Sequence, residues 1–226
     1  MGAAINVSDV MRRVYVWMLG GLAITALAAF AVAQSGLMIT NPVVLLVAFL
    51  VEIGLVIGIT ARINHMSPST AGLLFAAYSA VNGLTLSLIF VVYDLGDITI
   101  AFVATAAMFG AMSIVGYTTK MDLSRLGSIL FMALIGLIIA SLLNLFLQSA
   151  TLYWIVSYAG VLIFVGLTAW DTQKIKRMAE QVSVQGGGDL EVAVGRLSVI
   201  GALILYLDFI NLFLFILRIV GGGRRS

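Results

Sequence analysis

Cysteine is absent from this 226-residue chain, proline occurs only twice, and there is a single histidine. Without cysteine, disulfides, thiolate metal sites and cysteine nucleophiles are excluded. Charge is also scarce: Asp, Glu, Lys and Arg make up 10% of the residues, whereas a typical soluble domain has about one quarter. The net charge of +2, with no basic stripe interleaved with aromatics, excludes nucleic acid as a partner.

Hydrophobic residues are abundant instead, at 62% of the chain. One small domain cannot bury this much apolar surface, so we expect a lipid bilayer to cover much of it. Seven apolar runs are each long enough to cross a hydrocarbon core of about 30 Å as a helix rising 1.5 Å per residue. Helices satisfy the backbone without water, which predicts an all-α integral membrane protein forming a single domain over 1–226. The spans are predicted near 14–33, 43–61, 71–93, 99–117, 127–147, 152–171 and 198–219.

The loops predict an orientation in the membrane. Nine of the twelve basic residues collect on the face that carries the N-terminus, and the loops of the opposite face have none. The positive-inside rule then places the N-terminus in the cytoplasm and, after an odd number of spans, the C-terminus outside. Arg218, Arg224 and Arg225 lie on the outer side against this trend. The N-terminus is not typical of a cleavable signal, so we expect a multi-pass protein of the cell's inner (plasma) membrane.

Ionised groups are costly at membrane depth and tend to persist where they are paired, hydrated or used. Asp171 ends the sixth predicted span and Asp208 lies near the middle of the seventh. The midpoint between them falls in the Gly-rich segment 185–189, whose Asp189 is a plausible N-cap. If the sixth helix continues past Asp171 and the seventh begins as early as Leu190, both carboxylates lie at about the same depth. Two desolvated carboxylates in contact share one proton, which predicts a proton-operated latch.

Three further charges lie in or at the ends of spans. Glu52 and Arg62 are ten residues apart in the second span, and Asp208 and Arg218 are ten apart in the last. If Arg62 reaches Asp208, one antiparallel register also places Glu52 level with Arg218. Simpler alternatives stay open, because a terminal arginine commonly snorkels to water and Asp171 could face the cytosol. Glu52 could be a protonated hydrogen-bond donor between helices.

Polar residues elsewhere in the spans and the absent motifs narrow the possible functions. Asn82, Asn144 and Asn211 are predicted to bridge helices. The last span has no lysine for retinal, and no span has a histidine for a membrane serine protease. An intramembrane aspartyl protease is disfavoured, because Asp208 follows Tyr206-Leu207 and no Gly-x-Gly. We therefore expect no enzyme and no tightly bound cofactor.

Two segments around the aspartates carry a family resemblance. Thr168-Ala169-Trp170-Asp171-Thr172-Gln173-Lys174-Ile175 and Leu205-Tyr206-Leu207-Asp208-Phe209-Ile210-Asn211-Leu212-Phe213 are similar to the signature ends of the Bax inhibitor-1 family, also called the transmembrane Bax inhibitor motif family. The resemblance is closest to bacterial members. It implies a central last helix wrapped by the other six, and a pH-sensitive calcium leak. It also implies that Asp171 and Asp208 are the sensor pair, that Arg62 latches them, and that Glu52 and Arg218 form a further ion pair.

The leading hypothesis is therefore a calcium leak channel gated by protonation of Asp171 and Asp208. Calcium is the permeating ion, and the ionised carboxylates would be transient oxygen ligands for it. The main alternative is a non-conducting regulator that binds a membrane protease or another membrane protein. A proton-coupled transporter of a small solute is a third possibility, which would show saturable solute uptake.

Overall fold

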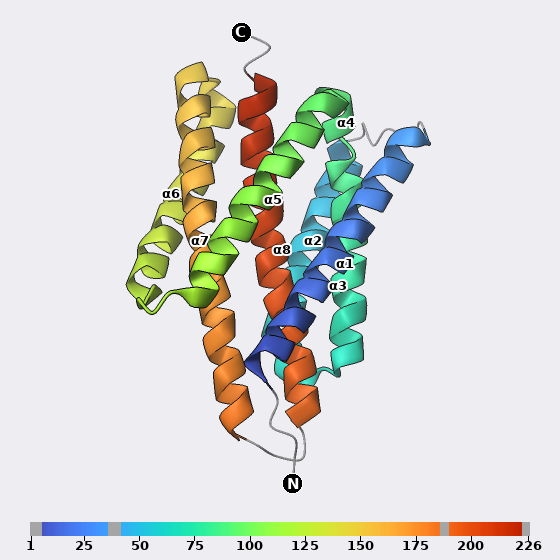
Figure 1. The fold of residues 1–226 in the computed structure, drawn as a ribbon. Coiled ribbons are helices and arrows are strands. Elements are labelled where there is room, and N and C mark those ends of the chain that lie inside the picture. Colours follow the sequence, from blue (N-terminus) through green and yellow to red (C-terminus); the bar gives the residue numbers. More distant parts are fainter. Residues whose placement is uncertain (1–5, 36–41, 186–189, 223–226) are drawn as a thin grey trace. The chain divides into compact units, whose positions relative to one another are not determined.

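The computed structural model describes residues 6–35, 42–185 and 190–222, and every regular element in them is a helix. In chain order the elements are α1 (Val7–Gln34), α2 (Pro42–Arg62), the 3-10 turn η1 (Ile63–His65), α3 (Pro68–Leu86), α4 (Ile89–Val92), α5 (Leu95–Thr118), α6 (Ser124–Leu147), α7 (Ala150–Gln185) and α8 (Leu190–Gly222) (Figure 1). Seven spans in this described part are long and apolar enough to cross a membrane. The all-α membrane class is thus confirmed.

The last two helices are the longest. α7 has 36 residues and α8 has 33, so they extend about 54 Å and about 50 Å at 1.5 Å per residue. Both exceed the hydrocarbon thickness of about 30 Å. The expectations that the sixth helix continues past Asp171 and that the last begins at Leu190 are confirmed. Asp189, predicted as the N-cap of α8, lies outside the described residues.

The predicted span 71–93 is confirmed as Pro68–Val92, which is long and apolar enough to cross a membrane. Its regular helix is interrupted after α3, where the Ser87 hydroxyl donates to the carbonyl of Leu84 at 2.6 Å, and the short α4 follows. The next helix, α5, begins at Leu95, and Asp97 lies in its first turn. An acidic side chain is favourable there, since the N-terminal end of a helix dipole is positive.

The chain forms two compact units, and α7 and α8 pass through both. Unit 1 comprises Met1–Val92 and Ile175–Tyr206, and unit 2 comprises Tyr93–Lys174 and Leu207–Ser226. The prediction of a single domain therefore stays a prediction.

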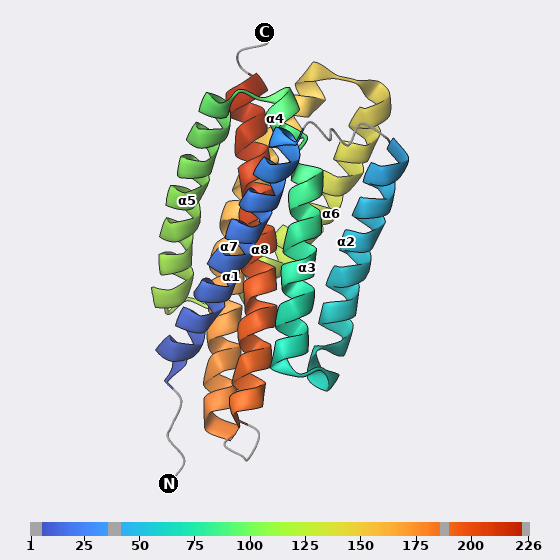
Figure 2. The same ribbon diagram turned by 90° about the vertical axis from the view of Figure 1, so that its right-hand side faces the viewer.

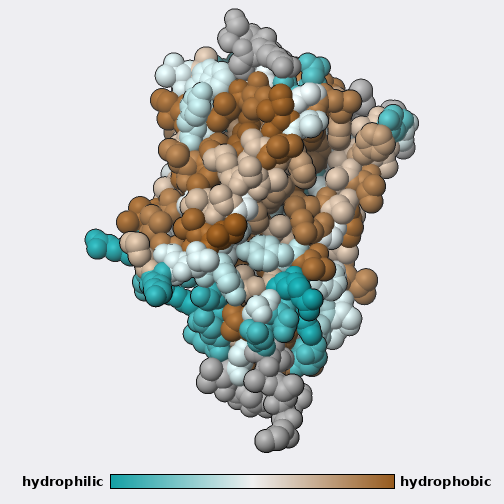
Figure 3. All heavy atoms as spheres, viewed as in Figure 1, coloured by the Kyte–Doolittle hydropathy of each residue, from teal (hydrophilic) through white to brown (hydrophobic). Residues whose placement is uncertain are grey.

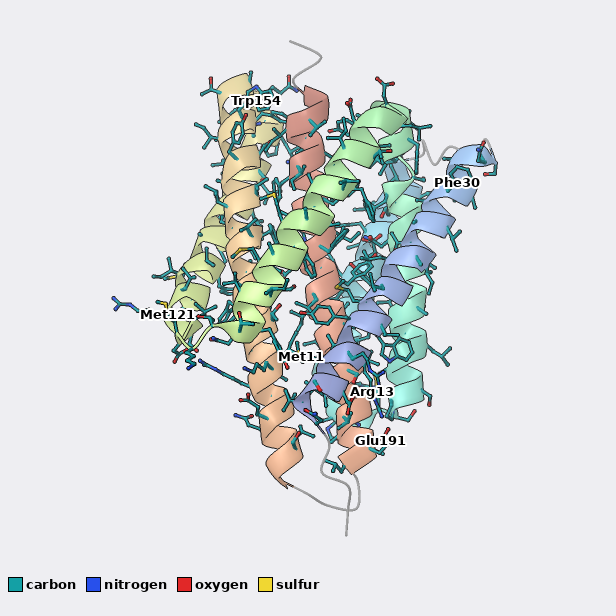
Figure 4. All side chains as sticks on the ribbon, viewed as in Figure 1. Met11, Arg13, Phe30, Met121, Trp154 and Glu191 are labelled. Carbon is teal, nitrogen blue, oxygen red and sulfur yellow. The ribbon has the colours of Figure 1, made fainter. Side chains whose placement is uncertain are left out.

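In unit 1, α3 lies between α1 and α2 (Figure 2). Gly83 permits the close approach of α3 to α1, because a Cβ there would lie 2.6 Å from the carbonyl oxygen of Thr25. The first half of α8 packs on α1 and the end of α7 through a core of Val10, Ala179, Val194 and Leu197. At the same end, Arg13 of α1 and Glu191 of α8 point toward one another and form an ion pair (Figure 4).

In unit 2, aromatic rings join α8 to its neighbours. Phe209 packs edge-on against Phe102 and Phe109 of α5, with ring centroids 5.6 and 5.4 Å apart, and Phe215 stacks on Phe164 of α7 at 5.8 Å. Along its most apolar stretch α8 is 72% buried, against 6–33% for the other spans. The neighbours of α8 are thus mainly protein, which is the burial that a helix covered by the others requires.

The remaining helices expose apolar side chains, as lipid-facing helices do. Figure 3 shows mostly hydrophobic atoms over α5 and hydrophilic atoms over the last turns of α7. The exposed residues of α5 include Ile100, Val103 and Ile114, which are 51%, 61% and 65% exposed. These side chains would face acyl chains at no cost in a bilayer, whereas in water they would form an aggregation-prone patch.

Replacing Gly116 with leucine should destabilise unit 2. A Cβ at Gly116 would overlap the carbonyl of Ala169, so α5 and α7 would have to separate. Overpacking of this kind costs about 1–3 kcal/mol. The measurement is the thermal unfolding midpoint in detergent, with Gly110→Leu as the matched control, because nothing lies within 4 Å of a Cβ at Gly110. Equal midpoints for the two variants would contradict the prediction.

Candidate functional site

The structure brings Asp171 and Asp208 together in unit 2. Asp171 comes from α7 and Asp208 from α8, and their side chains are 7% and 5% exposed. The two carboxyl groups interact directly with each other. The protonation of one acid therefore depends on that of the other.

A hydrogen bond between these groups requires a proton. An ionised carboxylate can only accept, so one of the two acids must carry the hydrogen that is shared. The buried Oδ2 of Asp208 has no hydrogen-bond partner in the described part of the chain. A proton shared between the two acids would give such an oxygen a partner, whereas two ionised carboxylates could not.

Lys174 is the basic residue whose charge acts on both carboxyl groups. It lies on α7 three residues after Asp171, is exposed, and places its Nζ 4.9 Å from the centre of the Trp170 ring. Next to it, Gln173 donates to the carbonyl of Met121 at 2.7 Å and accepts from the backbone N–H of Leu123 at 2.9 Å. The segment between α5 and α6 is thereby tied to α7 close to the acid pair.

The other predicted site residues are divided between the units. Arg62 ends α2 in unit 1 and is exposed, whereas both aspartates belong to unit 2. Glu52 belongs to unit 1 and Arg218 to unit 2, where its guanidinium lies 5.4 Å from the centre of the Phe215 ring. The latch through Arg62 and the ion pair of Glu52 with Arg218 would each join the two units, and both stay predictions.

A hydrogen-bond chain in unit 1 joins Glu52 and Asn82 to partners that the sequence did not predict. Glu52 accepts from the Thr85 hydroxyl at 2.8 Å and from the Asn82 amide at 3.3 Å. The hydroxyl of Tyr206 donates to the amide oxygen of Asn82 at 2.9 Å and lies 2.6 Å from the hydroxyl of Thr25. We name these five residues, from four helices, the Glu52 network. A signal was present in the sequence, since Ser79, Asn82 and Thr85 recur every three residues on one helix face.

The predicted bridging role holds for only one of the three asparagines. Asn82 joins α2 to α8, whereas Asn144 accepts from the backbone of Ser149 at 3.0 Å and Asn211 donates to the carbonyl of Leu207 at 2.8 Å. These last two bonds are local. Asn144 thus helps to end α6, and Asn211 bonds within its own helix.

Asp97 is a further buried acid, and the sequence did not single it out. Its side chain is 3% exposed, and it packs in unit 2 near the end of α8, where a Cβ on Gly221 would lie 3.6 Å from its Oδ2. The burial of Asp97 could not be predicted from the sequence, because a helix terminus and an exposed loop have similar composition.

Comparison with known proteins places the chain in a family. The family model described as "Inhibitor of apoptosis-promoting Bax1" matches residues 7–225. The inner membrane protein YbhL of Escherichia coli is 50% identical over 218 residues, covering 95% of this chain and 92% of that protein. An uncharacterized protein of Borreliella burgdorferi is 42% identical over 220 residues, covering 96% and 93%. An uncharacterized membrane protein of Streptococcus pyogenes is 42% identical over 185 residues, covering 82% and 77%.

The family model extends over nearly the whole chain and spans both aspartate segments. Together with seven membrane-spanning helices and the buried acid pair of α7 and α8, this match agrees with the resemblance seen in the sequence. The chain belongs to the Bax inhibitor-1 family.

Proposed function

We propose that this protein is a pH-sensitive calcium leak channel of the inner (plasma) membrane, gated by the proton that Asp171 and Asp208 share. The observation that carries the proposal is the contact of two carboxyl groups at 7% and 5% exposure between two membrane helices. Buried acids inside a membrane protein are costly, and they commonly mark an ion or proton pathway.

The shared proton provides the gate. While one proton is held between the acids, their hydrogen bond ties α7 to α8 within unit 2. When that proton leaves, two negative groups repel each other at short range in a medium of low dielectric constant, and the tie is lost. The ionised carboxylates then offer the hard oxygen ligands that calcium prefers. Because calcium takes about 6–8 oxygen ligands, most of its shell in passage would be water. Arg62 is the proposed latch that holds the closed arrangement.

Calcium flux into liposomes that contain only this protein is the test. Flux should depend on the pH of the medium, with protein-free liposomes as the control. A flux that does not vary with pH would contradict the gate, and the absence of any flux would contradict the channel. The substitutions that assign the pH dependence to the acid pair are treated in the Discussion.

The alternative function is a non-conducting regulator of a membrane protease or another membrane protein. One observation favours it: α7 extends beyond a membrane thickness and carries the charged residues Lys174, Lys176 and Glu180 on that extension. Such a surface would suit a protein partner. The regulator should co-purify with its partner and leave calcium flux at the protein-free level, whereas the channel should conduct alone.

The proposed orientation has a direct test, since the chain has no cysteine of its own. Asp94 and Lys120 flank α5, and each is replaced by cysteine in a separate variant. The two cysteines should react from opposite sides of the membrane with a thiol reagent that cannot cross it. If the N-terminus is cytoplasmic, Asp94→Cys is labelled in intact cells and Lys120→Cys only after the cells are opened. The reverse pattern would invert the orientation.

A further inference from the structure

The segment between α5 and α6 is fixed in place at one end of unit 2. Residues 119–123 join two membrane spans, so they lie at a membrane surface. The side chain amide of Gln173 on α7 is buried, and it bonds to the backbone of both Met121 and Leu123. These two bonds hold the segment against the turn of α7 that follows the acid pair.

Three cations gather around this fixed segment. Lys120 and Arg125 come from its two ends and Lys174 from the adjoining turn of α7, and all three side chains are exposed. In the described part of the chain none of the three has an ion-pair partner. Asp122, the acid of the same segment, accepts from the backbone N–H of Ser124 at 2.9 Å. The surface therefore has an excess of positive charge that the protein itself does not neutralise.

An aromatic ring places the ammonium group of Lys174 beside α6. Its Nζ lies 4.9 Å from the centre of the Trp170 ring, which is the distance of a cation–π contact. The ring in turn packs on α6 so closely that a Cβ at Gly127 would lie 2.2 Å from a ring atom. Gly127 is two residues after Arg125, so both cations lie near the first turn of α6. A side chain that is already ordered loses less entropy when it binds an anion.

Apolar side chains surround the cations and indicate a lipid rather than a soluble anion. Met121 lies on the segment itself and is 73% exposed (Figure 4), and Leu126 and Ile129 of α6 are 42% and 52% exposed. Figure 3 shows hydrophilic atoms at this end of unit 2 next to hydrophobic ones. Acyl chains can cover the apolar side chains while the cations meet the headgroups, because lysine and arginine reach from apolar surface to the membrane interface.

We propose that Lys120, Arg125 and Lys174 bind the phosphate of an anionic phospholipid, whose acyl chains contact Met121. Clusters of basic residues next to membrane spans attract anionic headgroups. Trp170 suits the same depth, since tryptophan is enriched at the interface between the bilayer and water. The site lies wholly in unit 2, and lipid binding there does not require that the protein conducts calcium.

Two lipids that differ in the charge of the headgroup test this site. The full chain in detergent is mixed with phosphatidylglycerol or with phosphatidylcholine of the same acyl chains. Phosphatidylglycerol should remain bound in native mass spectrometry and raise the thermal unfolding midpoint, whereas phosphatidylcholine should do neither. Glycerol phosphate supplies the anion without acyl chains and should not bind. Equal binding of the two lipids, or equal stabilisation by glycerol phosphate, would overturn the proposal.

Charge-removing variants locate the site. Lys120→Gln and Arg125→Gln should each weaken phosphatidylglycerol binding about fivefold, and Lys174→Gln should do the same while Lys174→Arg retains the affinity. These side chains are exposed, so the variants should fold. Arg12→Gln is the matched control, because it removes an exposed cation of unit 1 that is paired with Asp9 at 3.6 Å. Unchanged affinity in the site variants, or an equal loss in Arg12→Gln, would show that no such site exists.

Discussion

Replacing Asp208 with asparagine should make calcium flux through the reconstituted protein independent of pH. Asparagine has nearly the shape of aspartate, but its side chain does not bind or release a proton as the pH changes. The pair in the variant can therefore no longer share a proton between two acids. Asp171 would keep a hydrogen-bond partner in the side chain amide, and α7 and α8 would stay together. The measurement is calcium uptake into liposomes over a pH series. A pH dependence of tenfold in the wild type corresponds to about 1.4 kcal/mol, and this difference should vanish in the variant.

Asp171→Asn should have the same effect, because the shared proton belongs to both acids. The double variant should add nothing further, as expected for two groups that act as one. Asp94→Asn is the matched control, since Asp94 is an exposed acid before α5 without a side-chain capping bond. If both single variants retained the pH dependence of the wild type, the acid pair would not be the gate. Loss of pH dependence in Asp94→Asn as well would point to a change outside the pair.

Replacing Tyr206 with alanine should cause the largest loss of stability among the substitutions considered. Tyr206 is 0% exposed, and its ring contacts Phe75 and Tyr78 edge-on, with both centroid distances at 5.6 Å. Truncation leaves a cavity in unit 1 and removes the central member of the Glu52 network. Large-to-small changes of buried aromatics cost about 3–5 kcal/mol. Inside a bilayer this cost arises from lost packing rather than from exposure to water.

Tyr206→Phe separates the hydroxyl from the ring. It keeps the packing on Phe75 and Tyr78 but leaves the amide oxygen of Asn82 without its donor, which should cost about 1–3 kcal/mol. Thermal unfolding in detergent should therefore rank the wild type above Tyr206→Phe, and Tyr206→Phe above Tyr206→Ala. Tyr158, which is 54% exposed on α7, provides the matched controls Tyr158→Phe and Tyr158→Ala. A Tyr206→Phe variant as stable as the wild type would mean that the Glu52 network adds nothing to stability.

Tyr206 and Asp208 bind α8 to different neighbours. Two residues along a helix correspond to a rotation of about 200°, so their side chains leave α8 on nearly opposite sides. Within unit 1, Tyr206 bonds to α1 and α3. Within unit 2, Asp208 interacts with Asp171 of α7. The sequence shows the spacing of these two residues directly, but not which helix each one meets.

The start of α3 could be predicted from neighbouring residues, whereas the burial of Asp97 depends on residues distant in the chain. Ser67 followed by Pro68 predicts the start of α3, and the Ser67 hydroxyl accepts from the backbone N–H of Thr70 at 3.1 Å. This cap depends on neighbours in the sequence and could be recognised there. The burial of Asp97 depends on the end of α8, which is more than a hundred residues away. No local pattern distinguishes it from the exposed Asp94.

The sequence alone determined the class of the protein, its seven spans and the acids that lie in or beside them, because apolar length and the cost of charge in lipid depend only on composition and local spacing. The tertiary structure decided which polar groups meet. It placed Asp171 against Asp208, and it gave Glu52 the partners Thr85 and Asn82. These contacts require the rotation and register of each helix about its axis, and close packing between helices that are distant in the chain sets both.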